Sequence, residues 1–124
     1  MEPPGGESKP NRQECRRHPR FKAAIQIELR LEQSAVPMRL HTADISIGGC
    51  YVETALTLEV GTRLDIQLWL REQKVIAKGV VVTKHPGFGN GIQFIPMPMQ
   101  DQHILGEFLD ALQQEQASQK IQPK

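Results

Sequence analysis

The sequence predicts a mainly β fold, a six-stranded antiparallel barrel of Greek-key-like topology with one C-terminal α-helix. Six short segments read as strands at regular spacing with turn residues between them, and those at residues 21–31 and 63–70 show the alternation of half-buried strands. After the last segment, the apolar residues change to the spacing of a helix. We expect the strands to close into a barrel because closure protects the edges that short strands would otherwise expose.

Three strands are expected in the first half of the chain. Residues 21–31 alternate apolar and polar side chains, which indicates one strand with a single buried face. A turn at residues 34–37 leads to a second strand at 38–45. Residues 51–54 continue as a third strand directly after a pair of glycines. The connection between the second and third strands is therefore expected to be tight.

The second half supplies three further strands and the helix. These strands are expected at residues 63–70, 75–83 and 91–95, with turns at 71–74 and at Pro86-Gly87. Prolines end the last strand, and the apolar residues beyond them fall on one helical stripe. The stripe consists of Ile104, Leu105, Phe108, Leu109 and Leu112. We expect the helix to pack on the barrel, although the stripe would equally suit a partner helix.

The length of 124 residues suits one domain with a core and is too short for two domains of ordinary size. We expect a disordered tail at residues 1–14, a folded domain at 15–116 and a flexible tail at 117–124. Lysine and arginine number 15 against 14 aspartates and glutamates, so the chain as a whole does not attract nucleic acid or acidic membranes. No segment resembles a membrane span or a signal peptide, and we expect a cytoplasmic protein.

The two cysteines, Cys15 and Cys50, form no metal-ligand pattern, because there is no C-x-x-C and no second pair of ligands at useful spacing. We therefore expect no metal site and no structural disulfide in a reducing compartment. Cys50 is expected to be a small hydrophobic residue of a strand, and Cys15 a partly exposed residue of the arm that precedes the first strand.

Three arginines, Arg16, Arg17 and Arg20, concentrate positive charge just before the first strand. Pro19 keeps this stretch out of a helix and favours an extended, movable arm. A guanidinium group can bind phosphate oxygens or the O6/N7 edge of guanine with two hydrogen bonds, and it can stack on a base. The arm therefore has the chemistry to bind a guanine dinucleotide. The alternative is a solvated basic stretch of a disordered tail.

A second group of polar residues follows the second strand. Asp44 and Ser46 are two positions apart, so we expect both side chains on one face of the strand. A carboxylate accepts from the N1 and N2 donors of guanine, and a hydroxyl can donate or accept beside it. Gly48 and Gly49 would allow a sharp bend with positive φ and close approach of a base. The alternative is a turn in which the aspartate and serine bind the local backbone.

In this order, the two motifs resemble those of PilZ domains, the bacterial receptors for cyclic di-GMP (c-di-GMP). Matching residues are Arg16 and Arg20 for R-x-x-x-R, and Asp44, Ser46 and Gly49 for D-x-S-x-x-G. Residues 91–94 also match a G-x-x-F-like strand that precedes the C-terminal helix in the family. The resemblance covers residues 15–112.

The resemblance implies a receptor without enzymatic activity or cofactor. It implies that c-di-GMP is bound by Arg16, Arg17, Arg20, Asp44, Ser46, Gly48 and Gly49. Closure of the arginine arm over the barrel would then signal to a downstream protein that the sequence does not identify. Cys15 stands just before the arginine motif, where the family residue influences whether one or two ligand molecules bind. The ligand stoichiometry therefore stays open.

Three other functions fit the sequence less well. An enzyme would recruit Ser46, but the G-x-S-x-G elbow and a positioned base are absent from the sequence. A barrel that binds single-stranded nucleic acid needs stacking aromatics on an open face, whereas most aromatics here fall at expected core positions. Trp69 faces away from its leucine neighbours, either under the helix or as an exposed contact. Some PilZ-like domains without the arginine motif act only as protein adaptors, but here that motif is intact.

Overall fold

The structure is a computed structural model that describes residues 19–34 and 36–121. The tail expected at 1–14 and most of the arginine arm lie outside these residues. The elements, in chain order, are β1 (Phe21–Lys22), β2 (Gln26–Leu31), β3 (Met38–Ile45), β4 (Gly49–Glu53), β5 (Arg63–Leu70), β6 (Gln73–His85), β7 (Gly89–Ile95) and the helix α2 (Met99–Ile121).

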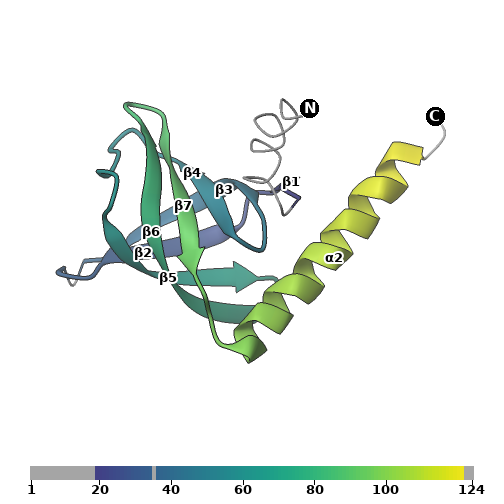
Figure 1. Cartoon of the computed structure of the whole chain (residues 1–124). Coiled ribbons are helices and arrows are strands. Elements are labelled where there is room, and N and C mark those ends of the chain that lie inside the picture. The colour runs from purple at the N-terminus through teal and green to yellow at the C-terminus, as the bar shows by residue number, and fades with distance from the viewer. Residues whose placement is uncertain (1–18, 35, 122–124) are drawn as a thin grey trace, which may run out of the picture.

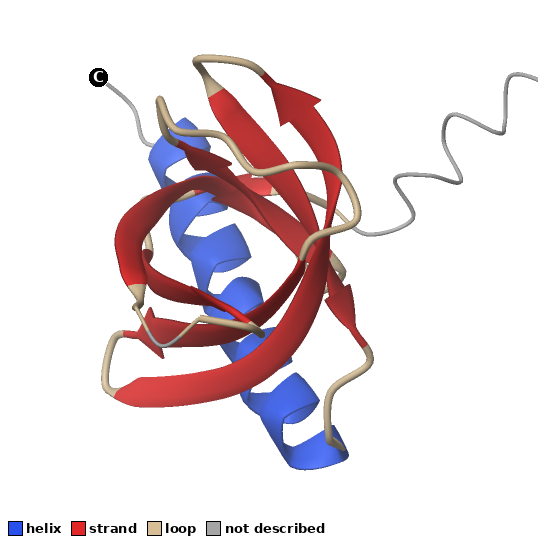
Figure 2. Ribbon diagram, turned by 90° about the vertical axis from the view of Figure 1, so that its left-hand side faces the viewer, coloured by secondary structure: helices blue, strands red, loops and turns tan. Residues whose placement is uncertain are grey.

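The strands form one antiparallel sheet that closes on itself. Their order is β1-β3-β2-β5-β6-β7-β4, and an additional pairing of β3 with β4 joins the two sides. Six strands therefore complete a barrel, and β1 lies beside β3 as a short addition (Figure 1). Figure 2 shows the curved sheet with α2 packed against it. The predicted fold class, a six-stranded antiparallel barrel with a C-terminal helix, is confirmed.

The first predicted strand is divided into β1 and β2, with a break at residues 23–25. The side chain of Thr42 on β3 explains the break. Its hydroxyl accepts from the Ile25 amide at 3.0 Å and donates to the Ala23 carbonyl at 2.7 Å. Because this hydroxyl satisfies backbone groups of the neighbouring segment, the chain stays beside β3 without a regular ladder.

The other predicted strands form, with shifts at several ends. β3 and β5 have the predicted bounds. β6 begins at Gln73 and extends to His85, so the predicted turn at 71–74 is shorter than expected. Arg71 allows this tight turn by adopting a φ of 60°. The helix continues to Ile121, beyond residue 117, where a flexible tail was expected to begin.

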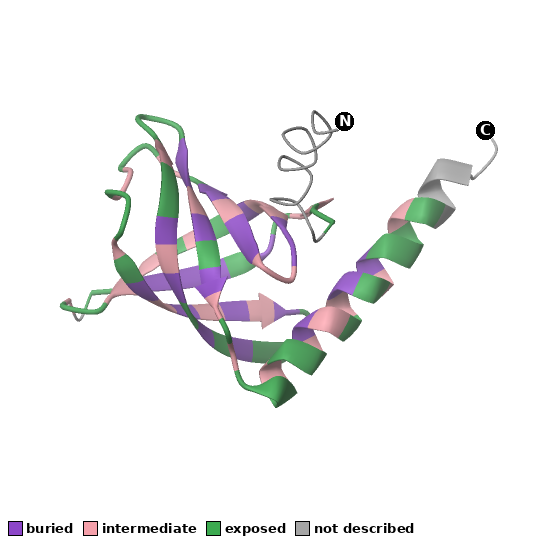
Figure 3. Ribbon diagram, viewed as in Figure 1, coloured by how far each residue is buried: buried purple, intermediate pink, exposed green. Residues whose placement is uncertain are grey.

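The core fills the barrel and the space beneath the helix. Buried and more exposed residues alternate along β5 and along the first part of β6, as the colours in Figure 3 show. Leu105, Leu109 and Leu112 are buried on one side of α2, and Ile104 and Phe108 pack beside them. The predicted apolar stripe of the helix is therefore confirmed as a surface that packs on the barrel. Within the described residues, no helix has the length and apolar character needed to cross a membrane.

Two polar contacts join α2 to the strands. The guanidinium of Arg71 forms two hydrogen bonds with the Glu115 carboxylate, at 2.9 and 2.8 Å, and lies 5.4 Å from the ring centre of Phe108. Further along the helix, the side-chain amide of Gln116 donates to the backbone carbonyl of Lys22 at 3.1 Å. The helix is thus attached both to the β5–β6 turn and to β1.

The contact between Arg71 and Glu115 predicts a stability difference that depends on pH. The hydrogen bonds from Arg71 hold the pKa of Glu115 below its ordinary value of 4.5. Because the pKa of this carboxyl group is lower in the folded protein than in the unfolded chain, its ionisation stabilises the fold at any pH above the unfolded-state pKa. This stabilisation is lost as the pH falls through the folded-state pKa. Glu115→Gln should therefore be less stable than wild type at neutral pH, and the difference should shrink in acid.

Thermal unfolding of both proteins, from neutral pH to below pH 4.5, measures this difference. Glu72→Gln changes an exposed glutamate of the adjoining turn and serves as the control. A gap between wild type and Glu115→Gln that stays constant with pH would contradict the prediction.

Candidate functional site

The two sequence motifs meet at an ion pair between Arg20 and Asp44. β1 pairs with the end of β3, with Lys22 opposite Asp44, so the residue just before β1 lies beside the aspartate. The Nη1 atom of Arg20 donates to Oδ1 of Asp44 at 2.9 Å. The two side chains are 47% and 27% exposed, and they lie 24 residues apart in the sequence. The fold therefore brings one arm arginine and the motif aspartate into direct contact.

The other arm residues, Arg16, Arg17 and Cys15, lie outside the described residues. Binding of the ligand by the two arginines therefore stays a prediction.

The backbone of β3 directs Asp44 and Ile45 to opposite faces. Ile45 is fully buried in the core, whereas Asp44 is partly exposed. Across the sheet, Asp44 lies between Lys22 on β1 and Tyr51 on β4. The aspartate is therefore held on the outer surface of the barrel with a strand on each side.

Ser46 was expected on the same face of the strand as Asp44, but the strand ends before it. It lies beyond the end of β3 and is only 6% exposed. Its amide donates to the Gly49 carbonyl at 2.8 Å, and its hydroxyl accepts from the Gly48 amide at 3.1 Å. The chain turns tightly here, so the serine hydroxyl binds the local backbone, as the alternative interpretation of the sequence expected.

The predicted positive φ at Gly48 and Gly49 is wrong. Among the described glycines, positive φ occurs at Gly61 and Gly87. Gly49 is needed for another reason: it pairs with β7, and a Cβ atom there would overlap the carbonyl oxygen of Ile92. This glycine therefore lets β4 approach β7 closely where the barrel closes.

Gly49→Ala is expected to lower the free energy of unfolding by about 1 to 3 kcal/mol, because the new methyl group meets backbone that cannot move aside. Gly106→Ala is the matched control, since a Cβ atom at this position of α2 meets no atom within 4 Å. There the change should raise stability by about 0.5 to 1 kcal/mol. Urea unfolding measures both variants, and equal effects of the two alanines would contradict the steric explanation.

Cys50 follows Gly49 and is buried with 1% exposure, as expected for a small hydrophobic residue of a strand. Burial, reinforced by the nearby Asp44 charge, raises the pKa of its thiol to about 12, and the charge of Arg20 acts in the opposite direction. At neutral pH the group is therefore an unreactive thiol.

Two aromatic side chains, of which the first lies beside the motif, were not singled out from the sequence. Tyr51, directly across the sheet from Asp44, is hydrogen-bonded through its hydroxyl to Nδ1 of His85 at 3.0 Å. Phe88 stands in the β6–β7 turn and is 75% exposed. Their positions depend on how three hairpins are aligned, which neither motif indicates.

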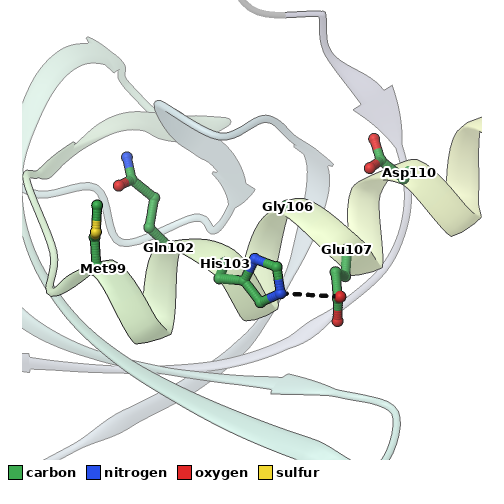
Figure 4. A pocket seen from close by; sticks show the side chains of 6 residues that line it. All are labelled: Met99, Gln102, His103, Gly106, Glu107 and Asp110. Atoms are coloured by element: carbon green, nitrogen blue, oxygen red, sulfur yellow. Dashed lines mark ion pairs between the residues drawn. The ribbon is translucent and has the colours of Figure 1, made fainter.

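A hollow of about 400 Å³ lies along α2 and contains an ion pair between His103 and Glu107 at 3.0 Å (Figure 4). Its lining residues are Met99, Gln102, His103, Gly106, Glu107 and Asp110. All six belong to the helix, and none to the strands that carry the motif. This hollow is therefore separate from the site at Arg20 and Asp44.

The sequence matches the family model of the PilZ domain over residues 14–111. This chain belongs to the PilZ domain family. The match includes the arginine motif, the aspartate motif, the whole barrel and the first half of α2. In this PilZ domain, the two motifs converge at the contact between Arg20 and Asp44.

Solved PilZ structures have the same fold. The PilZ domain of Escherichia coli YcgR with c-di-GMP has a TM-score of 0.69 at 16% identity, and the match covers 85% of this chain and 95% of that one. The K. pneumonia MrkH–c-di-GMP complex has a TM-score of 0.70 at 22% identity, covering 84% of this chain and 54% of that one.

The Bacillus subtilis inhibitor of motility, MotI/DgrA, has a TM-score of 0.67 at 20% identity, with 83% of this chain and 52% of that one covered. The chain thus spans about half the length of MotI and of MrkH. At these identities the similarity shows the fold of the PilZ domain. No curated protein sequence matches the chain.

Proposed function

We propose that this PilZ domain is a receptor that binds c-di-GMP at the end of the barrel where Arg20 meets Asp44, and that it signals to a partner protein. The observation that carries the proposal is the 2.9 Å contact between these two side chains, which joins the two family motifs on the outer surface. Membership of the PilZ family supports the ligand, and the similar YcgR and MrkH structures are complexes with c-di-GMP.

Each member of the pair has a partner on the ligand. The carboxylate of Asp44 can accept from the N1 and N2 donors of a guanine, and the guanidinium of Arg20 can donate to phosphate oxygens or to guanine O6 and N7. The pair is partly exposed, and such ion pairs contribute only about 0 to 1 kcal/mol. Breaking the ion pair so that Arg20 and Asp44 can each bind ligand atoms therefore costs little free energy.

The rest of the arm would close over the bound ligand. Ordering each arm residue costs about 1 to 2 kcal/mol of backbone entropy. Charge-assisted hydrogen bonds from Arg16 and Arg17 to phosphates would contribute about 1.5 to 3 kcal/mol each. The entropy cost and the hydrogen-bond contribution are similar in size. The arm therefore closes only when the phosphates of the ligand accept these hydrogen bonds. The surface formed by the closed arm and β3 is the one that a partner would recognise.

The proposed role is binding without catalysis. The Ser46 hydroxyl, which an enzyme would use as its nucleophile, is buried and accepts from the amide of Gly48 in its own turn. This arrangement supports a serine that shapes the turn.

Isothermal titration of the wild-type protein tests the proposed function. Saturable heat is expected with c-di-GMP and much weaker or no heat with GMP and linear pGpG, since neither presents two phosphates and two guanines in one ring. A folded wild-type protein that gives no heat with c-di-GMP would overturn the proposal.

A further inference from the structure

Phe88 has no role in the barrel, and its backbone is nevertheless fixed. The ring is 75% exposed. The amide of Phe88 donates to the His85 carbonyl at 2.8 Å, and its own carbonyl accepts from the Thr54 amide at 2.9 Å. A single exposed ring is common on protein surfaces, but a fixed ring contributes to a binding surface when other exposed groups gather beside it.

Tyr51 supplies a second ring nearby whose position is also fixed. Its hydroxyl is hydrogen-bonded to Nδ1 of His85 at 3.0 Å, and the two ring centres are 5.8 Å apart. The tyrosine ring lies over Gly89, where a Cβ atom would be 2.8 Å from both the hydroxyl and Cε2. The glycine therefore leaves the space that the ring occupies.

The two rings line one open hollow of about 430 Å³. Its lining residues are Tyr51, Glu53, Thr54, Ala55, Gly87 and Phe88. The rings offer faces for stacking, and the exposed Glu53 offers a carboxylate. A carboxylate repels phosphate but accepts from guanine N1 and N2, so this combination suits a guanine base.

The hollow adjoins the site at Arg20 and Asp44. Tyr51 is paired with Asp44 across neighbouring strands, which lie about 5 Å apart. Glu53 is two residues further along the same strand, about 7 Å away. A carboxylate is therefore available at each of two neighbouring places on the same surface, and c-di-GMP carries two guanines.

We propose that the hollow between Tyr51 and Phe88 binds one guanine of c-di-GMP while Arg20 and Asp44 hold the other. This inference rests on the proposed function, because it concerns the second base of the same ligand. Stacking on the two rings holds the base, and Glu53 accepts from its N1 and N2 donors.

The test is calorimetry of c-di-GMP with Phe88→Ala. Loss of one stacking face should weaken binding roughly 5- to 150-fold. Leu56→Ala is the matched control, because Leu56 is 82% exposed in the β4–β5 loop but does not line the hollow. That variant should bind within about twofold of wild type. Both side chains are exposed, so neither change should disturb folding.

The chain also allows direct detection of the stacking. Its sequence contains one tyrosine and one tryptophan, so the ring resonances of Tyr51 and Trp69 can be recognised by residue type in NMR spectra. Saturation with c-di-GMP should shift the Tyr51 ring signals, because a stacked base adds a ring current. Trp69 lies on β5, which is not paired with β4, and its signals should stay in place.

The outcomes separate the two proposals. If wild type binds c-di-GMP, Phe88→Ala binds within twofold of it and the Tyr51 signals do not move, the hollow is not a base site and the proposed function stands. That result would leave Phe88 as a surface for a protein partner. If folded wild type binds no c-di-GMP, the proposed function and the inference both fail.

Discussion

Asp44→Ala should weaken c-di-GMP binding at least about 100-fold. The carboxylate is the acceptor for two guanine donors, and hydrogen bonds to charged groups contribute about 1.5 to 3 kcal/mol each, so two of them correspond to about 3 to 6 kcal/mol. The expected loss comes from binding and not from unfolding, because the exposed pair with Arg20 contributes at most about 1 kcal/mol to stability. Calorimetry measures the affinity, and circular dichroism checks the fold.

The matched control for this variant is Asp65→Ala. Asp65 is a partly exposed strand aspartate that forms an ion pair with Lys78 at 2.7 Å, on a strand that does not carry the motif. It should leave affinity unchanged. Asp44→Asn keeps the size of the side chain and removes its charge, so it should bind weakly as well. Affinity of folded Asp44→Ala within about threefold of wild type would exclude the carboxylate from the site.

Arg20→Ala should reduce affinity by a similar factor, about 100-fold, and Arg20→Lys should restore only part of it. A lysine keeps the positive charge but loses the planar pair of donors that binds a phosphate or the guanine edge at two atoms. Titration of the two variants beside wild type measures the difference, and binding by all three should weaken as salt screens the phosphates.

Arg63→Ala is the control for charge alone. Arg63 is an exposed arginine whose ion pair with Glu32 is long, at 4.0 Å, and it lies on β5. This variant removes one positive charge and should keep wild-type affinity. If Arg20→Lys bound c-di-GMP with wild-type affinity, a positive charge at this position would be sufficient. That result would contradict the role proposed for the planar guanidinium group.

The barrel could be predicted from local patterns because strands and turns follow one another at regular spacing. The bounds of β5 follow directly from the alternation of apolar and polar side chains, and those of β3 from the turn residues on either side. The break before β2 could not be predicted in this way, because it depends on the hydroxyl of Thr42 on the next strand. The role of Gly49 could not be predicted either, since the atom that excludes a side chain there belongs to Ile92 on another strand.

The part of the candidate site that belongs to sequence motifs could be predicted. The motif residues Arg20 and Asp44 were selected from the sequence, and the structure places them in contact. Ser46 was expected to share a strand face with Asp44, but β3 ends at Ile45, so strand alternation does not extend to the serine. Tyr51 and Phe88 were missed because their significance depends on strand register and on the shape of a turn.

The contact between Gln116 and the carbonyl of Lys22 has a consequence for how far a change at the site can spread. Lys22 is also the residue opposite Asp44, and only Phe21 separates it from Arg20. The C-terminal helix and Arg20 are thus attached to the same two-residue strand, on either side of it. A displacement of that strand by as little as one peptide unit would change the neighbours of the helix end without altering the barrel.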